Sequence, residues 1–179
     1  MSYTREQAID SMLEKDPSCP RDILESLVLL DVKFLGFDSK IHEGQIVVHQ
    51  DVQKDIVDLF ELMQQEKFPL EEVSPIVKYN WDDEASMSAN NSSGFNYRKI
   101  AGQDIMSFHS QGKAIDLNPR INPWVQGETI QPANGSYNIE KAGTLFNGHP
   151  VVEFMKERGW EWLGDWEKYQ DYQHFQKEI

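Results

Sequence analysis

Residues 107–116 read Ser-Phe-His-Ser-Gln-Gly-Lys-Ala-Ile-Asp, and they bring an imidazole and a carboxylate together across a glycine turn. Gly112 can adopt a positive φ at little steric cost, so residues 113–117 can leave the turn as a β-strand. Side chains alternate along a strand, so Ala114 and Asp116 share one face. Because Ala114 is small, this arrangement leaves room beside Asp116 for an ion or a substrate.

This pair is suited to a metal site, because a neutral imidazole and a carboxylate are both ordinary zinc ligands. His109 and Asp116 supply only two ligands, however, and two ligands do not close a site. The best further donor lies near the C-terminus, where Asp171 and His174 stand three residues apart and can face one point. Either stretch in isolation more often makes a structural hydrogen bond, but the two together favour a metal site.

The wider pattern is Ser-x-His-x-x-Gly-x-Ala-x-Asp, followed by Gly-Trp-x-Trp, Asp-x-x-His and Phe. It resembles the zinc D-Ala-D-Ala carboxypeptidase and L-alanyl-D-glutamate peptidase family, which also holds the vancomycin-resistance dipeptidases. The matching residues are Ser107, His109, Gly112, Ala114, Asp116, Gly159, Trp160, Trp162, Asp171, His174 and Phe175. A segment from Ser86 to Arg98 is similar to the one that carries the family's active-site arginine. The resemblance runs from about Asp31 to the C-terminus and is specific from Ser86 onward.

The resemblance implies three zinc ligands, with a fourth position left for water: His109, Asp116 and His174. It implies that Asp171 is the general base and that Arg98 holds the substrate carbonyl or carboxylate and the charge that develops on it.

Four further residues bear on the site that the resemblance implies. Ser107 lacks the surroundings of a nucleophile, so we expect it to support the ligands or the substrate. Trp124 and Tyr137 either contact the substrate or pin their loop to the body. Leu163 departs from the Gly-Gly that often follows Gly-Trp-x-Trp in the family, and this departure bears on the identity of the substrate.

Composition excludes several other classes of function. Lys plus Arg number 17 against 30 Asp plus Glu, a net charge of −13, so a nucleic-acid backbone would be repelled. Cys19 is the only cysteine, which excludes an internal disulfide and a cysteine-rich zinc site. The chain shows neither an apolar signal core nor a run of about 18 apolar residues. We therefore expect no membrane span or export signal, and either an intracellular enzyme or one that uses another release route or lacks its leader here.

We expect a single compact domain overall, made of an N-terminal helical extension over residues 1–30 and a metallopeptidase domain over residues 31–179. In the extension, Thr4 and Gln7 form a possible capping box, and apolar spacing predicts a second helix that ends at Asp31. In the domain the patterns predict a hairpin (32–37 with 45–49), a helix (52–63), strands (74–79 and 94–100), an irregular excursion (118–148), a helix (151–158) and final strands around 160–162 and 172–176.

The resemblance implies an α+β fold, with a small, mostly antiparallel sheet flanked by helices and zinc in a cleft across it. The implied activity is hydrolysis of short D-amino-acid-containing peptides of bacterial cell-wall type. Carboxypeptidase, dipeptidase and endopeptidase action all remain open. A rival is a non-catalytic module on the same fold that binds a partner, as the hedgehog signalling domain does, or a glycan. Asp171 and Arg98 favour an enzyme, because a purely structural zinc needs neither.

Overall fold

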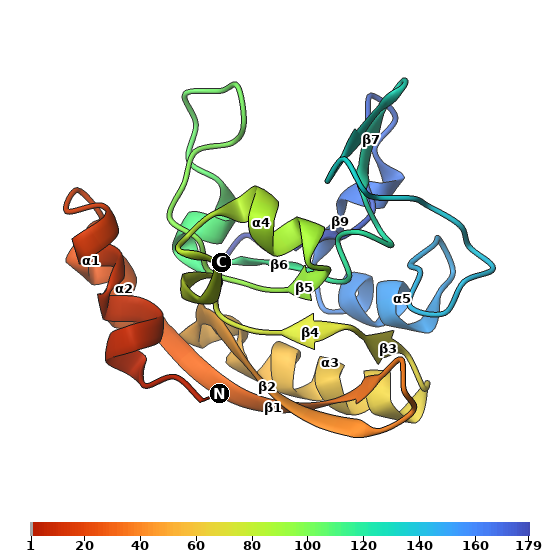
Figure 1. Ribbon diagram of the computed structural model, residues 1–179, viewed down its shortest axis with the longest axis horizontal. Coiled ribbons are helices and arrows are strands. Elements are labelled where there is room, and N and C mark those ends of the chain that lie inside the picture. Colours follow the sequence, from red (N-terminus) through yellow and green to blue (C-terminus); the bar gives the residue numbers. More distant parts are fainter. Residues whose placement is uncertain (1) are drawn as a thin grey trace.

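The computed structural model describes residues 2–179 and shows an α+β fold of short helices and small sheets (Figure 1). Its elements are η1 (Glu6–Asp10, a π-helix), α1 (Met12–Lys15), α2 (Arg21–Ser26), β1 (Leu27–Gly36), β2 (Ile41–His49), η2 (Gln50–Val52), α3 (Gln53–Gln65), β3 (Pro69–Leu70), β4 (Glu72–Val73), η3 (Ile76–Tyr79), α4 (Asp83–Ser88), β5 (Asn91–Ser92), η4 (Phe108–Gln111), β6 (Ala114–Asp116), β7 (Trp124–Gln126), β8 (Thr129–Gln131), α5 (Pro150–Glu157), β9 (Glu161–Trp162), η5 (Leu163–Asp165), β10 (Gln170–Asp171) and β11 (His174–Gln176). The η elements after η1 are 3-10 helices.

A long hairpin forms the base of the molecule. Strands β1 and β2 pair antiparallel from Leu27 opposite His49 to Leu35 opposite Ile41, and β3 adds a short parallel edge. Helix α3 contributes an apolar stripe to the buried core that it shares with the hairpin: Ile56, Leu59, Phe60 and Met63. Its period of about 3.6 residues puts these side chains on one face, as the sequence predicts. Figure 1 shows α3 lying along the hairpin.

The C-terminal elements form two further three-stranded sheets. Strand β11 lies between β6 and β9, and β7 lies between β10 and β8, with antiparallel pairing throughout. Helix α5 begins with Pro150 in its first turn, and Gly159 follows it with a φ of +79°, as the predicted helix requires. The structure thus holds four small sheets among the described residues, where the resemblance implied one.

Buried asparagines attach the long excursion to the body although the excursion has little regular structure. Asn118 Nδ2 donates to Pro69 O at 2.8 Å and to Gly143 O at 3.1 Å. Asn122 Nδ2 also donates to Gly143 O, at 3.0 Å, and its Oδ1 accepts from Leu145 N at 2.8 Å. Both side chains therefore replace the sheet or helix hydrogen bonds that this loop lacks.

Several predicted elements are wrong in detail. The second helix ends at Ser26 rather than at Asp31, because β1 begins at Leu27 and pairs with β2. Residues 74–79 hold the 3-10 helix η3 instead of a strand, and residues 94–100 form no strand beyond an isolated bridge of Lys99 with Met106. The excursion also contains a hairpin, β7–β8, although its prolines, glycines and weak periodicity predicted irregular structure.

The N-terminal segment is fastened to the hairpin. The capping box is present, since Thr4 N donates to Gln7 Oε1 and Gln7 N donates to Thr4 Oγ1. The Arg5 guanidinium donates to the carbonyl oxygens of Leu24 and Leu27 at 2.6 Å each. The division into an extension and a peptidase domain stays a prediction. None of the helices in residues 2–179 has the length and apolar character needed to span a bilayer.

Candidate metal centre

A tight local turn places His109. Ser107 Oγ accepts from His109 N at 3.3 Å and so caps the 3-10 helix η4, which ends at Gly112 with a φ of +67°. A Cβ at position 112 would lie 2.5 Å from Leu27 Cδ2 and 2.6 Å from His49 N. Both the backbone angle and the lack of space therefore require glycine, as the sequence predicts.

Strand pairing then brings His174 to the same point. In the β6–β11 ladder His174 stands directly opposite Asp116, although the two residues are 58 positions apart. Asp116 N also donates to Ser93 O, and Ser93 N donates to Asp116 O, which holds β6 from its other side. The register of one short sheet thus joins the two stretches that the sequence singles out.

His109, Asp116 and His174 converge on one buried point, with one candidate ligand atom from each residue within 4.8 Å of the others. Asp116 Oδ1 lies 3.0 Å from His174 Nδ1, and Asp116 Oδ2 lies 3.2 Å from His109 Nε2. The two ring nitrogens His109 Nε2 and His174 Nδ1 are 3.1 Å apart. Two imidazoles and one carboxylate form a donor set that zinc accepts.

The outer ring nitrogens show that this donor set fits a cation. His109 Nδ1 lies 2.6 Å from Gly94 O, and His174 Nε2 lies 3.1 Å from Gln176 Oε1. Each oxygen accepts a hydrogen, so a neutral imidazole turns its lone pair inward, toward Asp116. Two lone pairs and a carboxylate that face one another need a positive charge between them.

The charges at the site agree with this picture. Burial alone would raise the pKa of Asp116, but His109 and His174 lower it by more, so the carboxyl stays ionised. Burial would lower the pKa of His174, but the neighbouring Asp116 and Asp171 raise it above its ordinary value. The site therefore holds a permanent negative charge against two imidazoles.

Asp171 lies beside the triad on β10, where it pairs with Trp124 of β7. Its Oδ1 is buried and has no hydrogen-bond partner within residues 2–179. Burial raises the pKa of Asp171 to about 6, with the negative charge of Asp116 adding to the effect and His174 opposing it. A buried carboxylate with an unused oxygen next to candidate ligands is suited to accepting a proton.

The backbone of Arg98 lies close to the site, and its side chain forms an ion pair with Asp83. Ser107 N donates to Arg98 O at 3.1 Å, while Arg98 Nη2 lies 2.9 Å from Asp83 Oδ2. Asp83 Oδ1 also accepts from Asn96 Nδ2 at 3.1 Å. Arg98 Nε is buried, with no partner among the described residues. Asp83 was not among the predicted site residues, because no local pattern links it to a residue 15 positions away.

The remaining residues that the sequence singled out are Trp124 at the start of β7, Tyr137 in the excursion over residues 118–148, and Leu163 at the start of η5. The Trp124 ring lies 5.8 Å from that of Tyr169, and Tyr137 stacks on Tyr172 at 3.6 Å. Tyr137 Oη donates to Leu145 O at 2.7 Å. Leu163 is buried at the start of η5. Sequence reasoning missed the roles of Gly94 and Gln176 beside the two imidazoles; the only signal was that Gln176 shares a strand face with His174.

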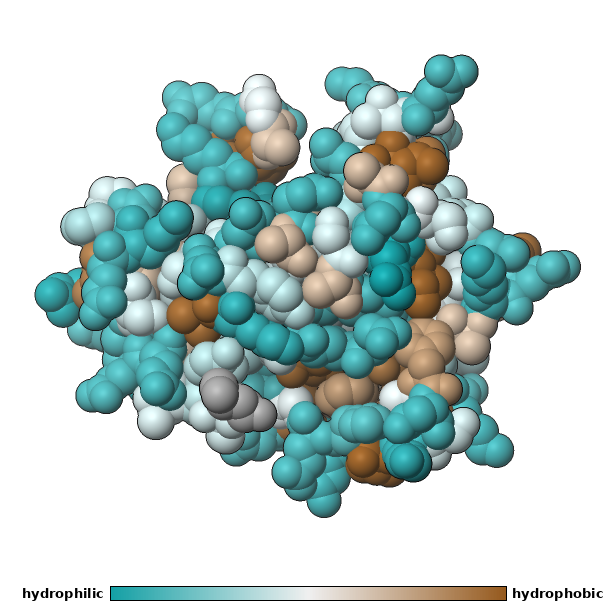
Figure 2. Space-filling view, in the orientation of Figure 1, coloured by the Kyte–Doolittle hydropathy of each residue, from teal (hydrophilic) through white to brown (hydrophobic). Residues whose placement is uncertain are grey.

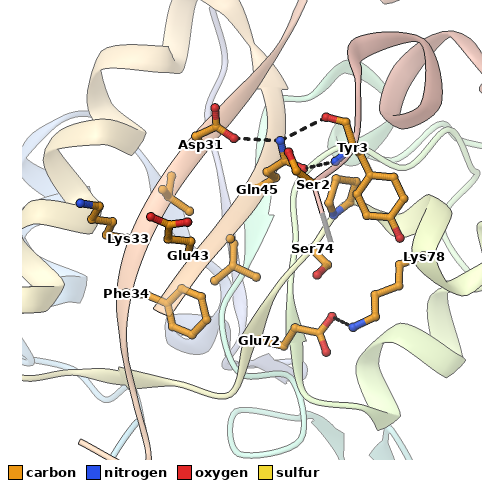
Figure 3. Close-up of a pocket in the computed structure, with 14 residues that line it drawn as sticks. Ser2, Tyr3, Asp31, Lys33, Phe34, Glu43, Gln45, Glu72, Ser74 and Lys78 are labelled. Atoms are coloured by element: carbon orange, nitrogen blue, oxygen red, sulfur yellow. Dashed lines mark hydrogen bonds and ion pairs between the residues drawn. The ribbon is translucent and has the colours of Figure 1, made fainter. Parts of the chain in front are cut away.

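A cavity of about 670 Å³ lies elsewhere, between the N-terminus, the hairpin, β4 and η3 (Figure 3). None of its lining residues belongs to the triad. Glu72 and Lys78 form an ion pair across it, and Gln45 Nε2 donates to Asp31 Oδ1 at 2.8 Å. Because these polar groups already have partners within the chain, the cavity offers no counterpart to the converging acceptors of the triad.

Comparison with known proteins agrees with this geometry. Residues 101–177 match the model of a family described as D-alanyl-D-alanine carboxypeptidase. Neither a curated protein nor a solved structure matches the chain. The matched residues include His109, Asp116, Asp171 and His174, the same residues that carry the sequence resemblance. The part of the chain that holds these four side chains is therefore similar to the D-alanyl-D-alanine carboxypeptidase family.

Proposed function

We propose that this protein is a zinc-dependent peptidase that hydrolyses short D-amino-acid-containing peptides of bacterial cell-wall type. The observation that carries the proposal is the convergence of His109 Nε2, His174 Nδ1 and the Asp116 carboxylate on one buried point. The outer nitrogen of each imidazole already lies beside an oxygen acceptor, so both lone pairs are available to a cation. The family match supports a peptidase reaction at this point.

These three residues would hold the zinc ion, which when bound lowers the pKa of water to near 7 and polarises a carbonyl. The protein supplies the rest of the chemistry. Asp171 would take the proton of the attacking water on its free Oδ1 and return it to the leaving amine. Its raised pKa, about 6, places it close to the range in which a group both accepts and releases a proton near neutral pH.

Arg98 would bind the substrate carbonyl or carboxylate without leaving Asp83. A guanidinium carries five N–H donors, and the ion pair with Asp83 joins only one nitrogen, Nη2. Arg98 Nε is buried and free of partners in the described chain. A substrate oxygen at this nitrogen would satisfy it and would place the charge of Arg98 beside the oxyanion.

Two projections are candidates for the walls of a substrate cleft. One is the loop closed by the bridge of Lys99 with Met106, and the other is the β7–β8 hairpin. Both stand above the body in Figure 1, and Figure 2 shows two separate lobes there above a mostly hydrophilic face. Trp124 begins the hairpin opposite Asp171, so this wall would border the reacting bond. The distance between the lobes would then decide between cleavage at a peptide end and within a longer chain.

The test is incubation of the pure protein with cell-wall stem peptides, with and without a chelator, with the products followed by mass spectrometry. We expect cleavage that disappears on chelation and returns with zinc, and the product masses name the bond. Protein that holds stoichiometric zinc and cleaves none of these peptides would contradict the proposed substrate class. Peptide or glycan binding that survives chelation would instead support a binding module.

A further inference from the structure

A chain of hydrogen bonds holds His174 on the side that faces away from the triad. His174 Nε2 lies 3.1 Å from Gln176 Oε1, and Gln176 Nε2 donates to Glu161 Oε2 at 2.8 Å. Trp166 Nε1 donates to the other carboxylate oxygen, Glu161 Oε1, at 2.9 Å. Gln176 and Glu161 stand directly opposite each other on β11 and β9, so the backbone pairing fixes their spacing. Four side chains thus form one continuous chain.

Glu161, at the end of the hydrogen-bond chain far from the triad, determines which group donates in each of these hydrogen bonds. An ionised carboxylate only accepts, so Glu161 takes the amide hydrogens of Gln176. The amide oxygen of Gln176 is then turned toward His174, and an oxygen of this kind also only accepts. His174 therefore donates its Nε2 hydrogen to Gln176. With a cation in the triad, the lone pair of His174 is then left on Nδ1, the nitrogen that faces His109 and Asp116.

We propose that Gln176 and Glu161 are positioning residues that select the tautomer of His174 able to bind a metal through Nδ1. This inference rests on the proposed metal centre and adds two residues to it. His109 has no such dependence, because its outer nitrogen meets the backbone carbonyl of Gly94. The backbone thus fixes the tautomer of His109, whereas side chains fix the tautomer of His174. Only the tautomer of His174 can therefore be changed by substituting its hydrogen-bond partner.

The two positioning residues are not expected to be equal. Gln176 is half-buried and contacts His174 directly, whereas Glu161 is exposed. Loss of an outer hydrogen-bond partner typically costs about 10-fold to 100-fold in metal affinity. We expect Gln176→Leu to weaken zinc binding within that range. Glu161→Gln should weaken it by less than about 10-fold, because water can replace an exposed acceptor.

A swapped double variant separates positioning from packing. Gln176→Glu alone sets two carboxylates opposite each other and should weaken zinc binding through their repulsion. In Gln176→Glu with Glu161→Gln, the carboxylate at position 176 accepts from His174 and from the amide at position 161, whose oxygen accepts from Trp166. Every donor again meets an acceptor, so zinc affinity should return to within about threefold of wild type or exceed it.

The measurement is the zinc dissociation constant, obtained by competition with a chromogenic chelator at fixed pH. Gln53→Leu, at an exposed glutamine at the start of α3, is the matched control and should bind zinc as wild type does. Thermal unfolding of the metal-free proteins reports any loss of folding. Wild-type affinity in Gln176→Leu, or no recovery in the double variant, would overturn the inference.

Nitrogen-15 NMR of His174 gives a second and independent readout. In metal-free wild type, at a pH where the imidazole is neutral, Gln176 favours the hydrogen on Nε2 and Asp116 favours it on Nδ1, so we expect both tautomers. In Gln176→Leu we expect the population to shift toward the Nδ1 tautomer. If wild type binds no zinc, the proposed function fails, and the tautomer measurement still decides this inference. An unchanged tautomer in Gln176→Leu would reject it.

Discussion

Two carboxylates, the partly buried Asp55 and the buried Asp116, have very different partners, and each has at least one from the C-terminal segment. Asp55 Oδ2, on α3, accepts from Trp160 Nε1 at 2.9 Å and from Lys177 Nζ at 2.8 Å. Asp116 instead faces two imidazole nitrogens whose rings already have oxygen acceptors on their outer side. Asp55 thus has all its hydrogen donors within the chain, whereas Asp116 faces ring nitrogens that are suited, together with it, to binding a cation. Burial of a charge by itself therefore does not mark a functional site. The two sites differ in whether the chain supplies hydrogen donors to the carboxylate, as it does at Asp55, or candidate metal ligands, as it does at Asp116.

Removal of one candidate ligand from the triad should have the largest effect. His109→Ala leaves two candidate ligands, so zinc affinity should fall by more than the roughly 100-fold cost of losing an outer partner, and peptide hydrolysis should fall below detection. Zinc content after dialysis, measured by atomic absorption, checks this. His42→Ala, at an exposed histidine paired with Asp38, is the control and should retain zinc and activity. Full zinc content in His109→Ala would place the metal elsewhere.

Asp171→Asn should separate chemistry from metal binding. Asn keeps the shape of the side chain but cannot take the proton of water, so kcat should fall by about 10²-fold to 10⁴-fold. Zinc content should not change, because Asp171 is outside the converging triad. Asp22→Asn, at an exposed position at the start of α2, provides a matched charge change that should leave kcat as it is. An Asp171→Asn variant with wild-type kcat would remove Asp171 from the reaction.

Substitution of Asp55 should lower the stability of the fold and leave the zinc content unchanged. Burial raises the pKa of Asp55, but Lys177 and Trp160 lower it by more, so it lies below its ordinary value. Such a carboxylate stabilises the fold above its unfolded pKa, about 3.9, and this stabilisation is lost as the pH falls through the folded value. Asp55→Asn should therefore lower the free energy of unfolding by about 2 kcal/mol at pH 7 and by much less near pH 3.

Urea unfolding at both pH values measures this difference. Asp58→Asn, on the same helix, is the control. Asp58 pairs with Lys54, whose side chain is 83% exposed, so its loss should cost less than about 1 kcal/mol. An equal loss for Asp55→Asn at both pH values would mean that the charge of Asp55 contributes nothing.

The sequence predicts best those features that depend on near neighbours. The turn at Gly112, the strand that carries Asp116 and the apolar stripe of α3 each follow from a short-range pattern, and the structure confirms them. The three candidate ligands were also predicted, through the motif, and they converge.

The missed features depend on contacts between distant residues. The apolar spacing over residues 23–28 fits a helix, but pairing with β2 makes Leu27 the start of a strand. Likewise, Asp83 beside Arg98 and Gln176 beside Glu161 meet only because loops and strands come together in the fold. Such pairs have no spacing rule that a single sequence could reveal.

Tyr137 is the hardest case for the contrast between Asp55 and Asp116. The sequence made it a candidate for substrate contact, yet like Asp55 it already has its partners within the chain. The ring stacks on Tyr172 with an angle of 8° between the planes, and the hydroxyl already donates to Leu145 O. Tyr137→Phe keeps the stack and removes one hydrogen bond, so it should lower the free energy of unfolding by about 1 kcal/mol and leave KM unchanged. Tyr137→Ala, which also removes the stack, should destabilise further. A large rise in KM for Tyr137→Phe, with stability unaltered, would instead show that the hydroxyl serves the substrate and that a residue with all its partners in place can still belong to the site.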